Sequence, residues 1–257
     1  MIAPTRRAGP HGAAPALILA AGLLVAWQSW TSARSTPKFL LPSPLDVAGA
    51  LVSGEGRLGW HALGTLEEAL IGLALAFALG VGTAILMDRN AFARRAFYPV
   101  LVASQTIPVI AIAPLLVFWF GYGLLPKVLV VALVCFFPVV VATFDGLGGV
   151  DPEAVRLVRS MGASGWQLFW RVRWPGALPG VFSGLRIGVT YGIVGAIVGE
   201  FVGSSRGLGY YLLSSADQLL TERVFAGIVV SAALSIALFL IVVLVEWLVV
   251  PWHRAER

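Results

Sequence analysis

The chain has 257 residues, of which 58% are hydrophobic and only 12% are charged. A soluble domain carries about 25% charged residues, so this composition excludes a soluble globular protein and indicates one that crosses a membrane several times. The net charge of +5 would be compatible with nucleic acid, but in so apolar a chain it more often reflects orientation in the bilayer, and no nucleic-acid partner is expected. The single cysteine, Cys135, excludes a disulfide within the chain.

Six segments are long and apolar enough to cross a bilayer, which needs about 20 residues per helix. The sequence therefore predicts an all-α membrane protein with six transmembrane helices. The spans are expected at 13–30, 69–87, 97–120, 124–144, 178–201 and 225–250. The first follows Arg6 and Arg7 as a signal peptide would, but its apolar core is too long and lacks a clear cleavage site, which favours an anchor.

The basic residues predict how the spans are oriented. With a cytoplasmic N-terminus, eleven of the eighteen lysines and arginines lie inside, six lie outside, and Arg186 lies in the fifth span. The six outside are Arg34, Lys38, Arg57, Lys127, Arg206 and Arg223. This bias predicts that both termini are cytoplasmic. The expected parts are an N-terminal tail (1–12), a transmembrane domain (13–250) with a cytoplasmic loop (145–177), and a C-terminal tail (251–257).

Outside the spans, local signals predict two further features. The segment 31–68 is expected to be a long external connection, with a short helix over 44–52 that Ser43 caps and Pro44 begins. In the third span, Pro108 and Pro114 are expected to kink the helix and free backbone carbonyls.

The cytoplasmic loop contains two predicted short helices with a turn between them. Asp151 and Pro152 can begin the first helix, and Gly162 can end it in the left-handed conformation. Ser164 and Gln167 form a capping box for a second helix, which Pro175 is expected to end. The segment 159–180 holds three tryptophans, several arginines and no acid. Such a surface either lies on lipid headgroups or fills a groove on another protein.

The loop resembles the cytoplasmic signature of ABC importer permeases, which is Glu-Ala-Ala, three residues, glycine, nine residues, then Ile-x-Leu-Pro. The matching positions are Gly162, Val172, Trp174 and Pro175, whereas the Glu-Ala-Ala positions hold Arg156, Leu157 and Val158. Segments 39–44, 104–108, 113–121 and 207–209 also resemble the branch of this family that serves nitrate, sulfonate, taurine and pyrimidine-type nutrients. The resemblance covers roughly residues 37–250.

The resemblance implies a type I ABC importer permease fold in a bacterial inner membrane. It also implies a homodimer, a separate cytoplasmic ATPase on which the loop docks as a coupling helix, and a soluble extracytoplasmic binding protein. Loop residues expected at the ATPase are Arg159, Met161, Gly162, Ala163, Trp166, Phe169, Val172 and Pro175. A hydroxymethylpyrimidine, the thiamine precursor, is the closest substrate by likeness, with sulfonate, taurine and nitrate as alternatives.

Polar residues within the spans are candidates for the translocation path, with ordinary helix–helix contacts as the alternative. They are Ser104, Gln105, Thr106, Thr190, Tyr191 and Glu200. Glu200 lies near the outer end of the fifth span, where it is expected to be either a gate residue or an interfacial carboxylate. Arg186 is expected to reach the inner headgroups or, as the alternative, to contact substrate, and Glu246 is expected to pair with an arginine or lie at the interface. Gly192, Gly195 and Gly199 form a face suited to close helix packing.

The sequence contains no motif of an enzyme and no cofactor site. Neither lysine lies in a phosphate-binding loop, so ATP hydrolysis is expected in another subunit. No histidine–acid cluster suggests a metal, and no Ser–His pair lies at membrane depth. The alternatives to an importer subunit are a stand-alone secondary carrier and a membrane-surface scaffold. A proton-coupled carrier would usually show acids near the membrane midplane, and the spans have none there.

Overall fold

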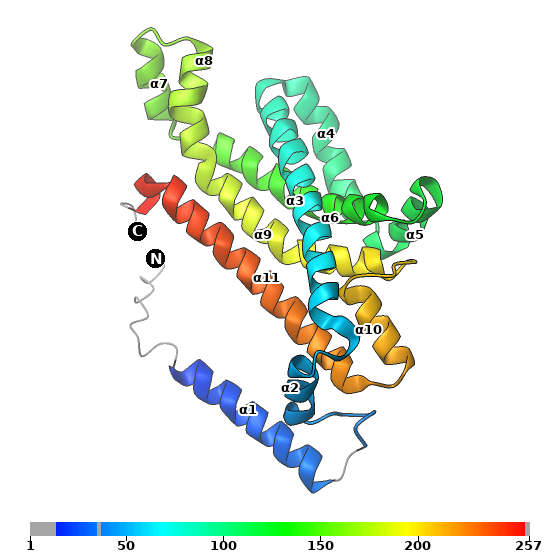
Figure 1. Ribbon diagram of the computed structural model, residues 1–257. Helices are drawn as coiled ribbons and strands as arrows, with labels where there is room; N and C mark the ends of the chain where they lie inside the picture. The colour runs from blue at the N-terminus through cyan, green and yellow to red at the C-terminus, as the bar shows by residue number, and fades with distance from the viewer. Residues whose placement is uncertain (1–13, 35–36, 255–257) are drawn as a thin grey trace. The chain divides into compact units, whose positions relative to one another are not determined.

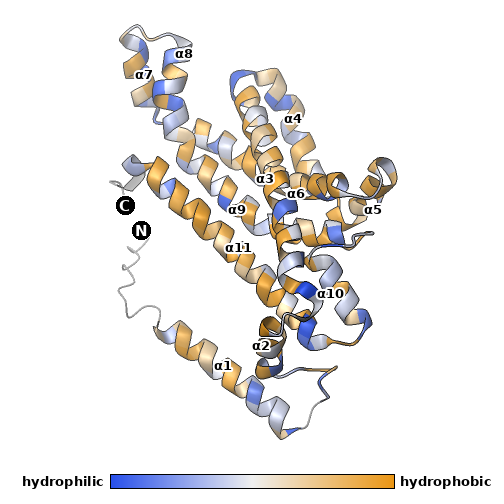
Figure 2. Ribbon diagram, in the orientation of Figure 1, coloured by the Kyte–Doolittle hydropathy of each residue, from blue (hydrophilic) through white to orange (hydrophobic). Residues whose placement is uncertain are grey.

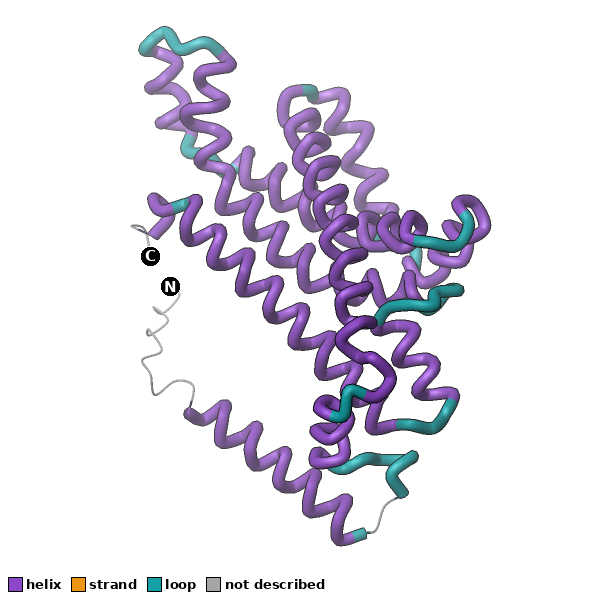
Figure 3. Tube along the Cα trace, viewed as in Figure 1, coloured by secondary structure: helices purple, strands orange, loops and turns teal. Residues whose placement is uncertain are grey.

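A computed structural model describes residues 14–34 and 37–254, and every regular element within them is a helix (Figure 1 and Figure 3). The predicted N-terminal tail, 1–12, lies outside the described residues. The long helices are α1 (Ala14–Ala33), α3 (Leu58–Arg89), α6 (Leu124–Gly148), α9 (Trp174–Glu200) and α11 (Thr221–Val249). The shorter α-helices are α2 (Pro44–Val52), α4 (Ala91–Ser104), α5 (Val109–Phe120), α7 (Pro152–Ser160), α8 (Gly165–Leu168) and α10 (Leu208–Asp217).

The predicted all-α membrane fold is confirmed. Within the described residues, five helices are long and apolar enough to span a bilayer, and there are six spans if the bent pair α4–α5 counts as one. Figure 2 shows apolar residues along most of α11 and mixed polar and apolar residues on α7 and α8. The chain divides into two compact units. One contains the described residues up to Leu58 together with Leu212–Ile228, and the other contains Gly59–Tyr211 and the described residues from Val229 onward.

In the first unit, α2 begins as its sequence predicts. Ser43 is the N-cap and forms a capping box with Asp46, and Pro44 occupies the first turn. The Asp46 carboxylate accepts hydrogen bonds from Lys38 Nζ (2.6 Å) and from the Ser43 hydroxyl (2.7 Å) and backbone N–H (3.0 Å). These donors favour the ionised carboxylate, so they lower the pKa of Asp46 from 3.8 to about 2.

This lowered pKa predicts how the start of α2 responds to acid. The contribution of Asp46 is complete above its unfolded pKa of about 4, and it is lost as the pH falls through about 2. Carbon-13 NMR of the labelled carboxyl should therefore give a midpoint near 2. In the Lys38→Met variant, which removes the largest cause, the midpoint should move up toward the ordinary value. An unchanged midpoint in that variant would contradict the assigned cause.

The second predicted span is longer than expected. The sequence predicts it at 69–87, but α3 has 32 residues and begins at Leu58, inside the segment 31–68 that is expected to be a connection. At 1.5 Å per residue this helix is about 48 Å long, well beyond the roughly 30 Å of hydrocarbon. The first turns of α3 carry His61, Glu67 and Glu68. These polar side chains lower the hydropathy at the start of the helix, so the apolar pattern alone begins the span too late.

The predicted third span, 97–120, is interrupted at Pro108, where a kink is expected, but the change of direction is sharper than a kink. α4 ends at Ser104, α5 begins at Val109, and the two axes differ by 102°. Pro108 caps α5 and cannot donate a backbone hydrogen bond, and it disfavours a helical conformation at Ile107. Pro114 lies inside α5 without breaking it. The two pieces, about 21 and 18 Å long, are each shorter than the hydrocarbon core.

The core of the second unit lies where α3, α6 and α9 meet, and α6 and α9 form its most extensive helix pair. Leu73, Val131, Cys135 and Ile193 are among its buried residues. The predicted small-residue face of α9 is confirmed. Gly192, Gly195 and Gly199 lie against α6, where added Cβ atoms would meet Cys135, Val131 and Lys127. Glycines therefore allow the two backbones to approach closely.

We expect Gly184→Ala in α9 to destabilise the protein by about 1–3 kcal/mol. The new Cβ would lie 2.8 Å from the Pro138 carbonyl oxygen and 2.9 Å from the Ala142 Cβ, so one helix must shift. Gly82→Ala in α3 is the matched control, since no atom lies within 4 Å of its added Cβ. Thermal unfolding in detergent measures both, and equal midpoints for the two variants would contradict the packing argument.

Candidate functional site

A helical hairpin projects from the second unit between α6 and α9, and its turn is built as predicted. Asp151 caps α7 by accepting the Glu153 N–H (2.8 Å), and Ser164 and Gln167 form the capping box of α8. Between the two helices, Gly162 has a φ of +83°, a conformation that side chains disfavour. Its N–H donates to the Arg159 carbonyl at 3.0 Å. The turn is thus set by local hydrogen bonds.

The second arm of the hairpin continues into the membrane helix. Pro175 was predicted to end this arm, but helical structure runs without interruption from Gly165 to Glu200. A π-helical turn, Phe169–Arg173, joins α8 to α9, and the Trp174 N–H donates to the Phe169 carbonyl. Pro175 directly follows this π-helical turn, where the hydrogen-bond pattern shifts, so the helix can pass a residue that has no N–H. Movement of the hairpin can therefore pass directly into α9.

The tip of the hairpin is exposed and its base is packed. Met161 is 78% exposed and Trp166 is 64% exposed, whereas Phe169 is only 5% exposed. Gly162 and Arg159 are exposed as well, and Ala163, Val172 and Pro175 are half-buried. The predicted loop residues thus fall into two groups. Those near the turn are accessible to a partner, and those near the membrane helices hold the hairpin in place.

Two contacts anchor the base. The Arg173 guanidinium makes a two-pronged ion pair with Asp88 at the end of α3, with both N–O distances at 2.7 Å, and it also donates to the Leu147 carbonyl. Phe169 packs with Leu147 and Ala177, and the Arg89 guanidinium lies over its ring at 4.7 Å. Bidentate arginine–carboxylate pairs are directional as well as strong, so the hairpin is tied to α3 and α6.

The predicted path residues form two separate groups. Ser104, Gln105 and Thr106 lie at the break between α4 and α5, where the hydroxyls of Ser104 and Thr106 donate to carbonyls three residues back. Thr190 and Tyr191 lie in the middle of α9 and are exposed. No hydrogen bond in the described part of the chain joins the two groups. Both lie on the surface of the single chain.

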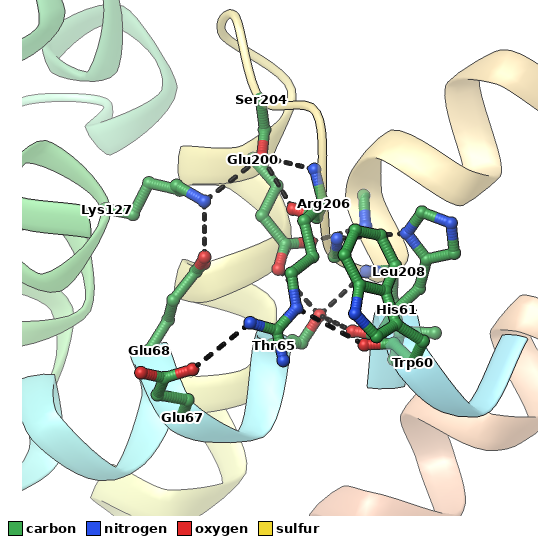
Figure 4. Close-up of polar contacts among 12 residues, drawn as sticks. Trp60, His61, Thr65, Glu67, Glu68, Lys127, Glu200, Ser204, Arg206 and Leu208 are labelled. Carbon is green, nitrogen blue, oxygen red and sulfur yellow. Dashed lines mark hydrogen bonds and ion pairs between the residues drawn. The ribbon is translucent and has the colours of Figure 1, made fainter. Parts of the chain in front are cut away.

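Glu200 differs from the other predicted path residues, because it is 1% exposed. Its carboxylate accepts from the Thr65 hydroxyl (2.6 Å) and from the Gly209 N–H (2.5 Å), and the Leu208 N–H donates to Thr65 Oγ1 (2.7 Å). Figure 4 shows these groups converging between α3 and the start of α10. Glu200 and Thr65 therefore satisfy the free N–H groups at the start of α10, and Glu200 faces the protein interior.

The Gly207-Leu-Gly209 motif has a structural reason in the same place. Gly207 has a φ of +123°, and a Cβ there would overlap the Glu200 carboxylate. A Cβ at Gly209 would lie 2.6 Å from the Ile197 carbonyl oxygen. The Gly207 N–H donates to His61 Nδ1 at 3.1 Å. Glycines at these two positions let the chain turn tightly over the buried acid.

Sequence reasoning missed a buried ion pair beside this site. Glu68 of α3 pairs with Lys127 of α6, and Lys127 also donates to Ser204 in the loop after α9 (3.1 Å; Figure 4). The Glu68 side chain is 4% exposed. We call Thr65, Glu68, Lys127, Glu200 and Ser204 the polar network. Opposite charges near the ends of two predicted spans were the only sequence signal, and Lys127 was assigned to an external loop.

A second ion pair gives Arg186 a partner within the protein. Arg186 Nε lies 3.4 Å from Glu246 Oε2, joining α9 to α11. The expectation that Glu246 pairs with an arginine is confirmed. The cation within the predicted fifth span thus has its charge balanced by the protein itself.

Comparison with known proteins agrees with this architecture. Residues 74–250 match the family described as "Binding-protein-dependent transport system inner membrane component". The formylaminopyrimidine transport permease protein of Halalkalibacterium halodurans is 40% identical over 91% of this chain and 94% of its own length. The riboflavin transport system permease protein of Chloroflexus aurantiacus is 38% identical over 91% of this chain and 88% of its own length. The taurine transport system permease protein of Escherichia coli is 31% identical over 90% of this chain and 86% of its own length.

The family match covers more than half of the chain, and these relatives match it along nearly its whole length. The family match includes the hairpin, the bent pair α4–α5, α9 and α11. The chain therefore belongs to the family of binding-protein-dependent transport system inner membrane components and is an inner-membrane permease subunit of an ABC importer.

Proposed function

We propose that the α7–α8 hairpin couples a separate cytoplasmic ATPase to the membrane helices. The observation that carries this proposal is the contrast between an exposed apolar tip and a base tied to α3 and α6. Packed contacts and a bidentate ion pair resist deformation, so force on the tip would move α9 instead of bending the hairpin. The partner-facing residues are Arg159, Met161, Gly162, Ala163 and Trp166, and the base holds Phe169, Val172 and Pro175.

We further propose that two copies of the chain enclose the translocation path, with both termini in the cytoplasm. The distribution of lysine and arginine supports this orientation, which places the hairpin on the ATPase side. The surface positions of Ser104, Gln105, Thr106, Thr190 and Tyr191 support a path completed by the second copy. A soluble binding protein would deliver the substrate at the opposite face of the membrane.

For the substrate we propose a small pyrimidine, such as a hydroxymethylpyrimidine. The relative at 40% identity is named for a formylaminopyrimidine, whereas the taurine relative is 31% identical. The pairing of Arg186 with Glu246 adds support. Because Glu246 balances the charge of Arg186, this arginine is less suited to attract a sulfonate anion. Sulfonates, taurine and nitrate are the alternatives to be tested.

Purification of the tagged chain from its native membrane, with a trapped ATP analogue present, tests the assembly. We expect an ATPase subunit and a secreted binding protein to co-purify, and the binding protein can then be titrated with pyrimidines, taurine and nitrate. If the chain purifies alone in several mild detergents and transports substrate without ATP after reconstitution, the coupling role is wrong and the chain acts as a secondary carrier.

A further inference from the structure

A basic cavity of about 740 Å³ lies along the inner side of the hairpin, from its tip to its base. Arg159, Trp166 and Phe169 in its lining already have places in the proposed coupling role, but that role does not use Arg89 or Arg156. Its walls come from α7, from α8 and the π-helical turn, and from the ends of α3 and α6. The residues that concern its chemistry are Arg89, Arg156, Arg159, Arg173, Trp166 and Phe169. Four guanidinium groups thus line one hollow.

The cavity keeps a positive charge after its internal ion pairs are considered. Arg173 is balanced by Asp88, with N–O distances of 2.7 Å. Arg156 lies 3.9 Å from Glu153, and both side chains are largely exposed, so this pair is weak. Neither Arg159 nor Arg89 has an ion pair with any described residue, and the Arg89 guanidinium lies over the Phe169 ring. Three arginines can therefore face an anion.

In the orientation proposed above, the cavity lies beside the cytoplasmic ends of three membrane helices, and the inference rests on that orientation. Arg89 is the last residue of α3, Leu147 lies at the end of α6, and Arg173 directly precedes α9. Each of these three helices is long and apolar enough to span the bilayer. Trp166, Trp170 and Trp174 form a chain of ring contacts along the hairpin, with centroids 5.4 and 6.2 Å apart. Tryptophan is enriched at headgroup level, where the ends of membrane-spanning helices lie.

We propose that this cavity binds the phosphate headgroup of an anionic membrane lipid. Arginine forks match phosphate oxygens, and basic pockets between helices on the cytoplasmic side bind acidic headgroups. Arg156 and Arg159 lie on α7 whereas Arg89 lies on α3. A phosphate between them would bridge the hairpin to the membrane helices, so the lipid composition of the leaflet would affect how firmly the hairpin is held.

Lipid binding by the purified full-length chain tests this proposal without an ATPase. The chain, in neutral detergent, is titrated with phosphatidylglycerol and with phosphatidylcholine of the same acyl chains, and bound lipid is counted by native mass spectrometry. The Arg156→Gln/Arg159→Gln variant should bind phosphatidylglycerol roughly tenfold more weakly, with phosphatidylcholine unaffected. The matched control, Arg94→Gln/Arg95→Gln, removes the same charge from exposed positions of α4 and should bind like the original chain.

Three results would overturn the proposal. One is equal phosphatidylglycerol binding by the original chain and the Arg156/Arg159 variant, with circular dichroism showing both folded. Another is an equal loss in the α4 control, which would indicate attraction by overall charge. The third is displacement of the lipid by inorganic phosphate at similar concentration, which would identify a soluble anion as the ligand. If lipid binding is unchanged while the Arg156/Arg159 variant loses ATPase co-purification, the cavity serves an acidic protein surface instead.

Discussion

Replacing Gly162 with valine is expected to reduce ATP-driven uptake by about tenfold or more while leaving the permease folded in the membrane. The φ of +83° at this turn is strongly disfavoured for a β-branched residue, at a cost of about 1–2 kcal/mol. No atom lies within 4 Å of an added Cβ, so the strain acts on the turn and not on the core. The tip would change shape, and the tight fit that coupling requires would be lost.

Uptake and ATP hydrolysis by the reconstituted complex measure this effect together. We expect hydrolysis to continue without matching uptake. The control is Gly162→Asn, because asparagine tolerates the left-handed region better than other residues and should retain much of the transport. Normal uptake by the valine variant would count against the proposed coupling role, and poor membrane insertion of both variants would show a folding role for the turn.

Loss of the lysine from the buried Glu68–Lys127 pair should have the largest effect on stability. In Lys127→Met the Glu68 carboxylate stays buried without its cationic partner, which is expected to cost about 3–5 kcal/mol. The same change removes the contact with Ser204, which connects this pair to the loop after α9. We therefore expect a lower unfolding temperature and weaker contacts between the loop before α10 and α6.

A double-mutant cycle separates the pair from its individual residues. Glu68→Gln/Lys127→Met removes both charges, so it should recover a large part of the stability that Lys127→Met loses. Thermal unfolding of the single and double variants in detergent gives the coupling energy. If the double variant is as unstable as the sum of the two single ones, the residues act independently and the polar network does not hold α3 to α6.

The hairpin shows how far local sequence signals reach. Asp151, Ser164 and Gln167 cap helices through residues two or three positions away. Gly162 can adopt its positive φ because it has no Cβ. Such interactions need no distant partner, so they could be predicted. The continuity through Pro175 could not, because it depends on a π-helical turn that Arg173 and Phe169 hold by contacts with α3 and α6.

The path residues show the opposite limit. Glu200 was grouped with Ser104 and Thr190 because all are polar and lie within apolar spans. Its actual surroundings come from Thr65, which is 135 residues away in the sequence, and from the N–H groups at the start of α10. Lys127 is likewise counted only as an external charge in the sequence, because its partner Glu68 is 59 residues away.

The sequence by itself determined the membrane class, the approximate spans, the caps of the hairpin and the small-residue face of α9. These follow from hydropathy over about 20 residues and from hydrogen bonds within one helical turn. Only the tertiary structure decided that Glu68 and Glu200 are buried and which groups they meet, how sharply the third span breaks at Pro108, and how the hairpin is tied to the membrane helices. Those features depend on contacts between segments far apart in the chain, and no local pattern records which charges will meet once the helices pack.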